Sequence, residues 1–292
     1  MNSVVKYQVE PVVRTHLDFK IEHIPQYWFD DDPFKTRFFD ALSLTFPEGE
    51  RFFIESVRLF REQITDPVLA QKVKDFIRQE AQHGIAHERM NQQMLLQGMP
   101  VKEFTQSLRA RFSRLLKQKS PEYCIALTAA SEHLTALMAE CFFGEKQTMQ
   151  AAHPYARALL AWHAVEEMEH RDVAFDVMRV AKVDETTRKR ALLIVSVMML
   201  FFNSYRTHEM LKQDGFSALQ RAKLFMQGLP WFLGPQGQLS KMKSQYLDWF
   251  KADFHPSQHP VIAQYDQWLA TLAETADPIA AGDAFWEHGR EH

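Results

Sequence analysis

The stretch WHAVEEMEH, residues 162–170, places two histidines and three glutamates within a longer, partly apolar segment. Counted in helical steps of three and four, His163, Glu167 and His170 fall on one face, and the other two glutamates lie to its sides. Carboxylate and imidazole groups are costly to remove from water unless they gain a partner. The stretch therefore predicts a helix whose buried face needs a compensating partner.

Three other segments also carry an acidic residue in the middle of an apolar helical face. The longest such face reads Leu69, Val73, Phe76, Glu80, His83, His87, Met90 and Met94. The same spacing places Glu50 on the buried face of an earlier segment and Glu132 on that of a later one. Glu48 shares a different face with Phe52 and Glu55, and it is expected to be exposed.

Helix start signals organise most of the chain. A capping residue followed by proline marks four of the starts, and only 10 glycines interrupt the pattern. The expected helices span residues 33–46 with a bend and continuation to 64, 67–97, 121 to 143 or 150, 154–180, and 184–214. The predicted fold class is therefore all-α, with helices long enough for a four-helix bundle.

No composition shift or low-complexity linker divides the chain after its first helix. Residues 1–32 are expected to be irregular, and residues 33–292 to form a single helical domain. Within that domain the bundle core covers about residues 33–180, and a helical extension covers about residues 184–292.

Charge and cysteine content narrow the class of protein. The net charge of −3 and the pI near 6.5 give no basic surface for nucleic acid. Cys124 and Cys141 would lie roughly 25 Å apart on one helix, too far for a disulfide. Free thiols and the lack of a signal-peptide pattern at the N-terminus predict a cytoplasmic protein.

The most hydrophobic run, ALLIVSVMMLFF at residues 191–202, is too short to form a transmembrane segment. Its apolar character predicts a buried core helix, with a contact at a membrane surface or a second subunit as the alternative. The later stretch DWFKADFHPSQHP, residues 248–260, carries His255 and His259 and is expected to be a surface tail, with a cap over the site as the alternative.

The acids and histidines of the four segments form a recognisable ligand set. Glutamates from two helices and Glu-x-x-His pairs from two others are typical of a di-metal carboxylate site in a helical bundle. The predicted metal ligands are Glu50, Glu80, His83, Glu132, Glu167 and His170. Mixed carboxylate and imidazole ligands suit iron or manganese, with zinc less well matched. His87 and His133 have no matching partner and are expected in the core or behind the ligands.

The order of these motifs is similar to that of the ferritin-like di-iron superfamily. More closely, DDPFKTRFFDALSLTFPEGERFF, FIRQEAQHGIAHERMN and WHAVEEMEHRDVAFDV resemble a bacterial family catalogued as predicted metal-dependent hydrolases. The likeness extends from about residue 13 to the FHP at residues 254–256. It implies a ferritin-like bundle with additional C-terminal helices and a cofactor of two iron ions, although nothing in the motifs demands hydrolysis.

His163 adds a third histidine to the second Glu-x-x-His pair. The resulting His-x-x-x-Glu-x-x-His pattern resembles the arylamine N-oxygenase branch of di-iron proteins, in which an extra histidine binds one iron. On that resemblance His163 is a seventh metal ligand. The alternative is a histidine that hydrogen-bonds a ligand carboxylate.

These features predict a di-iron oxidase or oxygenase that activates O2 to oxidise a small apolar substrate. Six phenylalanines of the core helices are candidates for the substrate pocket, although packing alone would explain them: Phe53, Phe60, Phe76, Phe142, Phe143 and Phe175. The alternatives are a hydrolase that uses a dinuclear site and a non-catalytic iron-binding or ferroxidase protein. An electron-donor protein and a second copy of the chain are the macromolecular partners to expect.

Overall fold

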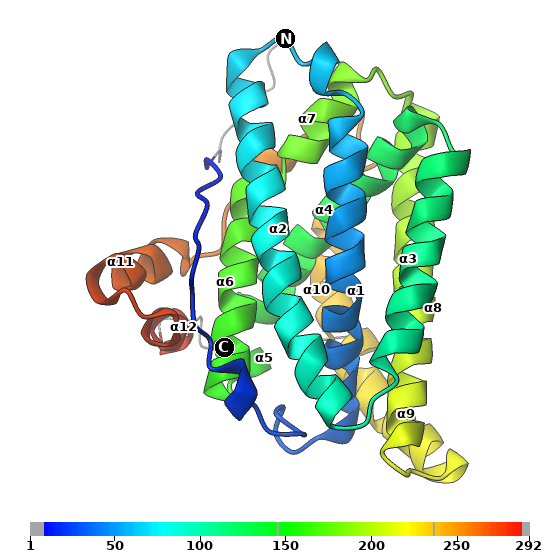
Figure 1. Ribbon diagram of the computed structural model, residues 1–292, viewed down its shortest axis with the longest axis vertical. Helices are drawn as coiled ribbons and strands as arrows, with labels where there is room; N and C mark the ends of the chain where they lie inside the picture. The colour runs from blue at the N-terminus through cyan, green and yellow to red at the C-terminus, as the bar shows by residue number, and fades with distance from the viewer. Residues whose placement is uncertain (1–8, 145, 236, 288–292) are drawn as a thin grey trace.

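The computed structural model describes residues 9–144, 146–235 and 237–287, and it is built of helices joined by short connections (Figure 1). Within those ranges the only strand-like pairing is a single β-bridge between Phe29 and Ala152. The predicted all-α fold class is confirmed.

Six helices are long: α1 (Pro33–Arg58), α2 (Pro67–Leu96), α3 (Val101–Gln118), α4 (Pro121–Phe143), α6 (Pro154–His170) and α8 (Glu185–Gln213). The shorter ones are α5 (Lys146–Met149), α7 (Val173–Val180), α9 (Ala218–Leu233), α10 (Gln238–Asp248), α11 (Tyr265–Thr275) and α12 (Pro278–Glu287). Single 3₁₀ turns occur at Ile21–His23, Arg61–Gln63 and Pro256–Gln258.

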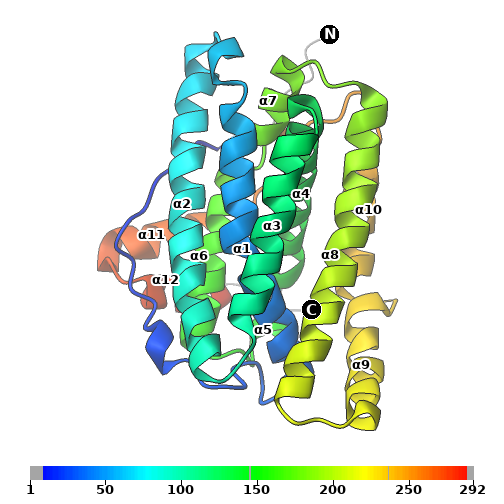
Figure 2. The ribbon, with the colours of Figure 1, turned by 45° about the vertical axis from the view of Figure 1, so that its right-hand side comes forward.

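Four of the long helices enclose the interior. Helix α1 contacts α2 and α4, and α6 contacts the same two helices, so that the four close a ring. Helices α3 and α8 pack against α1 from outside, α10 packs against α4, and α12 packs against α6 (Figures 1 and 2). The interior between α1, α2, α4 and α6 is where the predicted ligands should meet.

The helix starts follow from capping. Asp32 accepts hydrogen bonds from the backbone N–H groups of Phe34 and Lys35, Asp66 accepts one from Val68, and each precedes a proline. Ser120 and His153 cap α4 and α6 in the same way, again before proline. A proline at the first helical position loses no internal hydrogen bond. The four predicted starts at residues 33, 67, 121 and 154 are therefore confirmed.

The structure corrects three helix assignments. Helix α1 continues through Pro47 and ends at Arg58, short of the expected residue 64. The expected helices leave residues 98–120 unassigned, whereas the structure forms α3 there. The expected helix 154–180 is interrupted at Arg171 and Asp172, where the Ser257 hydroxyl donates to Asp172 at 2.9 Å. The C-terminal residues that stabilise this break are distant in sequence, so local patterns do not reveal it.

The prediction that residues 191–202 form a buried core helix is wrong. Only Ala191 and Leu192 of this run are buried, whereas Val197 is 66% and Phe201 62% exposed. The run lies in α8, which packs through one side only. None of the described helices is long and apolar enough to cross a membrane.

The expectation of a surface tail at residues 248–260 is also wrong. His255 is buried and lies 3.0 Å from Asp176, and His259 lies 3.0 Å from Asp248. Trp249 and Phe254 join the apolar core around α4 and α7. This segment is therefore part of the folded interior.

Candidate metal centre

The seven predicted residues converge inside the four-helix ring, and all are buried. They come from α1 (Glu50), α2 (Glu80, His83), α4 (Glu132) and α6 (His163, Glu167, His170). Two groups have potential ligand atoms within 4.8 Å of one another: Glu80, His83, Glu167 and His170, and Glu50, His83 and His163. Glu132 adjoins the first group, because its Oε2 lies 3.3 Å from His170 Nε2.

The carboxylates at the centre have few protein partners. His170 Nε2 lies 3.1 Å from Glu80 Oε1, at ion-pair distance but outside hydrogen-bond geometry. Neither side-chain oxygen of Glu50, Glu80 or Glu132 accepts a hydrogen bond within the described part of the chain. His83 Nδ1 and His170 Nε2 are likewise without a hydrogen-bond partner there. Buried polar atoms are normally satisfied, and an unpaired buried carboxylate is especially costly. A set of oxygen and imidazole nitrogen atoms left free in this way fits divalent metal ions.

The pKa values of the clustered glutamates also fit a site for metal ions. Burial and the neighbouring Glu80 raise the pKa of Glu50 well above its usual range, and burial with Glu80 does the same for Glu132. Burial would also raise the pKa of Glu167, but the adjacent His163 and His170 lower it. Without metal, several of these groups therefore hold protons that a bound cation would displace.

Two histidines are oriented by partners outside the cluster. His83 Nε2 lies 3.1 Å from Glu166 Oε2, and His170 Nδ1 lies 2.9 Å from Gln79 Oε1. The opposite nitrogen of each ring is thereby turned toward the central carboxylates. Such outer hydrogen bonds fix the ring position and tautomer of metal-binding histidines.

Behind these histidines lies an ion-paired network, here called the Arg14 network. Arg14 contacts Glu166 at 3.1 Å and Glu169 at 2.7 Å, and both carboxylates are fully buried. Gln79 donates to Glu169 at 2.7 Å, and the Tyr265 hydroxyl donates to it at 2.9 Å. Burial raises the pKa of Glu166 to about 8 despite its contact with Arg14.

Helical periodicity does not find the Arg14 network. Arg14 comes from the irregular segment before α1, and Tyr265 comes from α11. Both are far from α6 in the sequence, so helical spacing cannot pair them with it. The available signal is on α6 itself, where Glu166 and Glu169 lie beside the ligand face of a largely apolar helix and therefore need a compensating partner.

His163 bridges the cluster and a second hydrogen-bonded chain. Its Nε2 lies 2.9 Å from Glu167 Oε1 and 3.9 Å from Glu50 Oε1. Its Nδ1 lies 2.7 Å from His87 Nε2, and His87 Nδ1 lies 2.9 Å from the Ser43 hydroxyl. The geometry suits either role of His163, as a ligand or as a hydrogen-bond partner of Glu167. His87 is buried behind it, as expected.

His133, the other unmatched histidine, is buried away from the seven residues. Its ring stacks on Trp249 with centroids 5.0 Å apart. Burial lowers the pKa of His133 to about 3, so the ring is neutral. It is a core histidine, one of the two environments expected for it.

The prediction that Glu48 is exposed is wrong. Its side chain is only 3% exposed, and Arg109 of α3 contacts it at 2.7 Å. The face of α1 that carries Glu48 is covered by α3, the helix that the sequence patterns leave unassigned. Burial of an acid in this fold therefore does not by itself indicate a ligand.

Two small residues shape the space around the carboxylates. Gly84 of α2 faces Glu50, and a Cβ atom there would lie 3.2 Å from Glu50 Oε2. The Thr135 hydroxyl of α4 donates to Glu167 Oε2 at 2.6 Å. Glycine thus leaves room for the Glu50 carboxylate, and threonine fixes one oxygen of Glu167.

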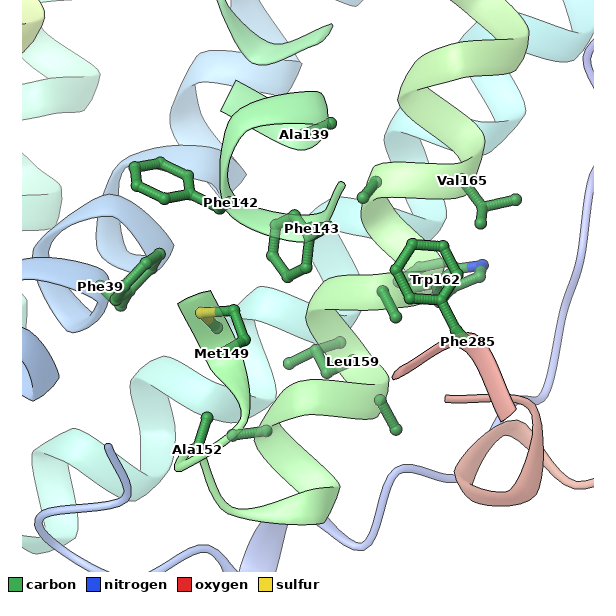
Figure 3. Close-up of a cluster of buried hydrophobic side chains, with 14 of the residues drawn as sticks. Phe39, Ala139, Phe142, Phe143, Met149, Ala152, Leu159, Trp162, Val165 and Phe285 are labelled. Carbon is green, nitrogen blue, oxygen red and sulfur yellow. The ribbon is translucent and has the colours of Figure 1, made fainter. Parts of the chain in front are cut away.

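An apolar cavity of about 50 Å³ adjoins His163 and Glu167. Its aromatic wall consists of Phe39, Phe46, Phe142 and Phe143. Figure 3 shows Phe39 on α1 facing Phe142 and Phe143 at the end of α4. The volume has room for a few water molecules, so a larger occupant needs movement of this wall. Of the six phenylalanines proposed for a pocket, only Phe142 and Phe143 line this cavity.

One comparison with known proteins gives a match. A family model described as "predicted metal-dependent hydrolase" matches residues 13–260. The matched segment covers α1 to α10, including all seven converging residues. No curated protein and no solved structure matches the chain.

Proposed function

The chain belongs to the family of predicted metal-dependent hydrolases, and we propose that its buried site binds two iron ions and activates O2 to oxidise a small apolar substrate. The observation that carries the proposal is a set of three buried glutamates whose side-chain oxygens accept no hydrogen bond from the described residues, with the His170 ring beside two of them. Four carboxylates can offset the charge of two divalent ions and bridge them, as in di-iron bundles. The same reasoning supports a ferritin-like arrangement of α1, α2, α4 and α6.

The proposed ligands are Glu50, Glu80, His83, Glu132, His163, Glu167 and His170. Two overlapping groups of closely spaced donors, one around Glu80 and His170 and one around Glu50 and His163, support two neighbouring ions. His163 is proposed as a ligand because its Nε2 faces Glu167 and Glu50, while His87 occupies its other nitrogen.

Bound ferrous ions would supply the electrons for reduction of O2. The chain's own residues orient and protect that chemistry. The Thr135 hydrogen bond holds one oxygen of Glu167 toward the cavity, and Gln79 and Glu166 fix the rings of His170 and His83. The phenylalanine wall gives an apolar lining to the side where an apolar substrate would lie.

Oxygen uptake by iron-loaded protein tests this proposal. Protein reconstituted anaerobically with Fe(II) should consume O2 on mixing, and an apolar aromatic substrate should increase the uptake. Ala139→Leu, which fills the cavity, should suppress the substrate effect while the iron content stays unchanged. Leu42→Met, a volume-conserving change in the same wall, is the matched control. Absence of O2 uptake by fully loaded protein would contradict the proposal.

The family description favours a second candidate, a hydrolase that uses the same two metal ions. Paired metals can lower the pKa of a bound water and polarise an acyl or phosphoryl oxygen. Zinc-loaded protein assayed with p-nitrophenyl acetate and p-nitrophenyl phosphate separates the two functions. Turnover of either ester that is lost in Glu132→Ala would favour hydrolysis.

A further inference from the structure

Helix α8 exposes an apolar stripe that nothing in the described structure covers. The exposed side chains recur every three or four residues and are Leu193, Ile194, Val197, Met198, Leu200 and Phe201, each at least 38% exposed. Isolated exposed apolar residues are ordinary, whereas a contiguous row on one helix marks a contact surface.

Helix α9 extends this apolar character. Its inner face packs on α1, where Phe225 and Phe232 contact Phe34 with ring centroids 5.0 Å and 6.1 Å apart. Its outer face is also apolar, and Leu219 and Met226 are 81% and 72% exposed. Helices α8 and α9 lie on the side of the molecule away from α2 and α6 (Figures 1 and 2). The exposed apolar residues of both helices are here called the α8–α9 face.

The charge around this face differs from that of the whole chain. The chain has 34 basic and 37 acidic residues, whereas residues 185–248, which contain α8, α9 and α10, have nine Lys and Arg against four Asp and Glu. Helix α3, which contacts α8 through the Arg111 and Phe202 side chains, has five basic residues against one acidic residue. The α8–α9 face is therefore flanked by positive charge on an otherwise acidic protein.

Part of this charge lacks a counter-ion. Arg111, Arg114 and Arg206 form no ion pair with any described residue, and the Arg111 guanidinium lies 3.5 Å from the centroid of the Phe202 ring. Arg206 donates to the Thr45 hydroxyl at 2.9 Å. Burial and the nearby Arg111 lower the pKa of Arg206 to about 10. Arg206 is buried, whereas Arg114 is exposed and Arg111 is half-buried. Arg111 and Arg114, here called the arginine cluster, are placed to meet an anion from outside the chain.

We propose that the α8–α9 face docks on the surface of an anionic phospholipid bilayer, with its apolar side chains among the lipids and the arginine cluster at the headgroup phosphates. Apolar residues flanked by basic ones are the pattern of interfacial membrane binding. A symmetric dimer through the same face is less well matched, because it would bring two surfaces of like charge together. The binding is peripheral, since no described helix could span the bilayer.

Sedimentation with lipid vesicles tests the docking. The full-length metal-loaded protein should sediment with vesicles of phosphatidylcholine and phosphatidylglycerol at low salt, and much less with phosphatidylcholine alone. A basic residue at an anionic surface contributes about fivefold to binding, so Arg111→Gln/Arg114→Gln should weaken it by about 25-fold. Val197→Ser/Phe201→Ser should abolish detectable sedimentation. The matched controls on the other side of the molecule, Arg58→Gln/Arg78→Gln and Val68→Ser/Ile85→Ser, should bind like the wild type.

Three results would overturn the proposal. One is failure of the wild-type protein to bind anionic vesicles at low salt, and another is an equal loss of binding in the control variants. The third is a lipid-free dimer that Val197→Ser/Phe201→Ser dissociates, which would assign the face to a second copy of the chain. None of these three results depends on the iron content or on O2 uptake without lipid. The metal-centre proposal can therefore fail or hold independently of the docking proposal.

Discussion

Helix α6 contributes acids to two buried regions that differ in what neutralises them. Toward the outside, Glu166 and Glu169 meet the guanidinium of Arg14, a protein cation held at 3.1 Å and 2.7 Å. Toward the inside, Glu167 faces a cluster in which Glu50 and Glu80 accept no hydrogen bond from the described residues. Buried acid alone therefore does not distinguish a structural ion pair from a candidate metal centre. The two regions differ in that the inner carboxylates cluster together and accept no hydrogen bond from the described residues.

The largest expected difference concerns metal content. Glu132→Ala and His170→Ala each remove a proposed ligand from the inner cluster, so metal should be lost in stoichiometric amounts while the helices remain formed. Glu48→Ala removes an acid that is equally buried but paired with Arg109, and its metal content should be unchanged. Elemental analysis and far-ultraviolet circular dichroism measure the two properties. Retention of two metals per chain by either ligand variant would contradict the proposed ligand set.

Loss of the Arg14 guanidinium should destabilise the Arg14 network. Arg14→Met removes the guanidinium that pairs with the buried carboxyl groups of Glu166 and Glu169, so the free energy of unfolding should fall by about 3–5 kcal/mol. Urea denaturation of the metal-free protein measures this loss. Arg78→Met, at an exposed position of α2, is the control and should change little. A loss below about 1 kcal/mol for Arg14→Met would mean that the network is solvated in solution.

Removal of an acid from the inner cluster should raise the free energy of unfolding of the metal-free protein. Glu50→Gln removes a buried acid without a protein partner, so the metal-free variant should be more stable than the wild type by about 1–3 kcal/mol near neutral pH. The same variant should bind metal weakly. Loss of stability on this substitution would show that Glu50 has a protein partner in the metal-free state.

The stability of the metal-free protein should also depend on pH. Because the pKa of Glu50 is raised in the folded state, that state binds a proton more tightly than the unfolded chain, whose pKa is about 4.3. The free energy of unfolding therefore falls as the pH rises from that value through the raised folded-state pKa. Glu166, whose pKa is raised to about 8, contributes with the same sign. Urea denaturation from about pH 6 to about pH 9 should show the fall, and Glu50→Gln should flatten it.

The smallest change in the free energy of unfolding is expected for substitution of Glu48, the acid on α1 that pairs with Arg109. Glu48→Gln breaks a contact with Arg109, whose side chain is 59% exposed and can turn to water. The free energy of unfolding should therefore change by less than about 1 kcal/mol. A larger loss would place Glu48 in the same class as the Arg14 network.

The sequence predicted the inner cluster better than the outer network for a physical reason. Glu80 and His83, like Glu167 and His170, share a face because helical spacing alone determines it. Arg14 and its carboxylates meet only through tertiary contacts between an irregular segment and α6, which no local pattern encodes. The helix starts were predictable because the capping residues and prolines act locally.

The wrong predictions of burial also concern residues whose surroundings depend on contacts between segments distant in sequence. Glu48 is buried because α3 packs over α1. Helix α3 carries Val101, Phe104, Leu108, Phe112 and Leu115 at helical spacing, but no capping side chain followed by proline marks its start. The hydrophobicity of the apolar run in α8 predicts burial, but it does not say whether another part of the same chain provides that burial. His255 and His259 lie in the interior because their segment packs against α4 and α7, far away in sequence.

Metal analysis of the purified protein, with Mössbauer spectra of an iron-57 sample, tests the central claim most directly. The proposed site predicts close to two irons per chain, antiferromagnetically coupled, because shared carboxylates hold the ions side by side. Two zinc ions retained after iron-replete expression would contradict the iron assignment and favour the hydrolase. Protein that binds no metal, even after anaerobic reconstitution, would show that the inner cluster is a set of buried protonated acids.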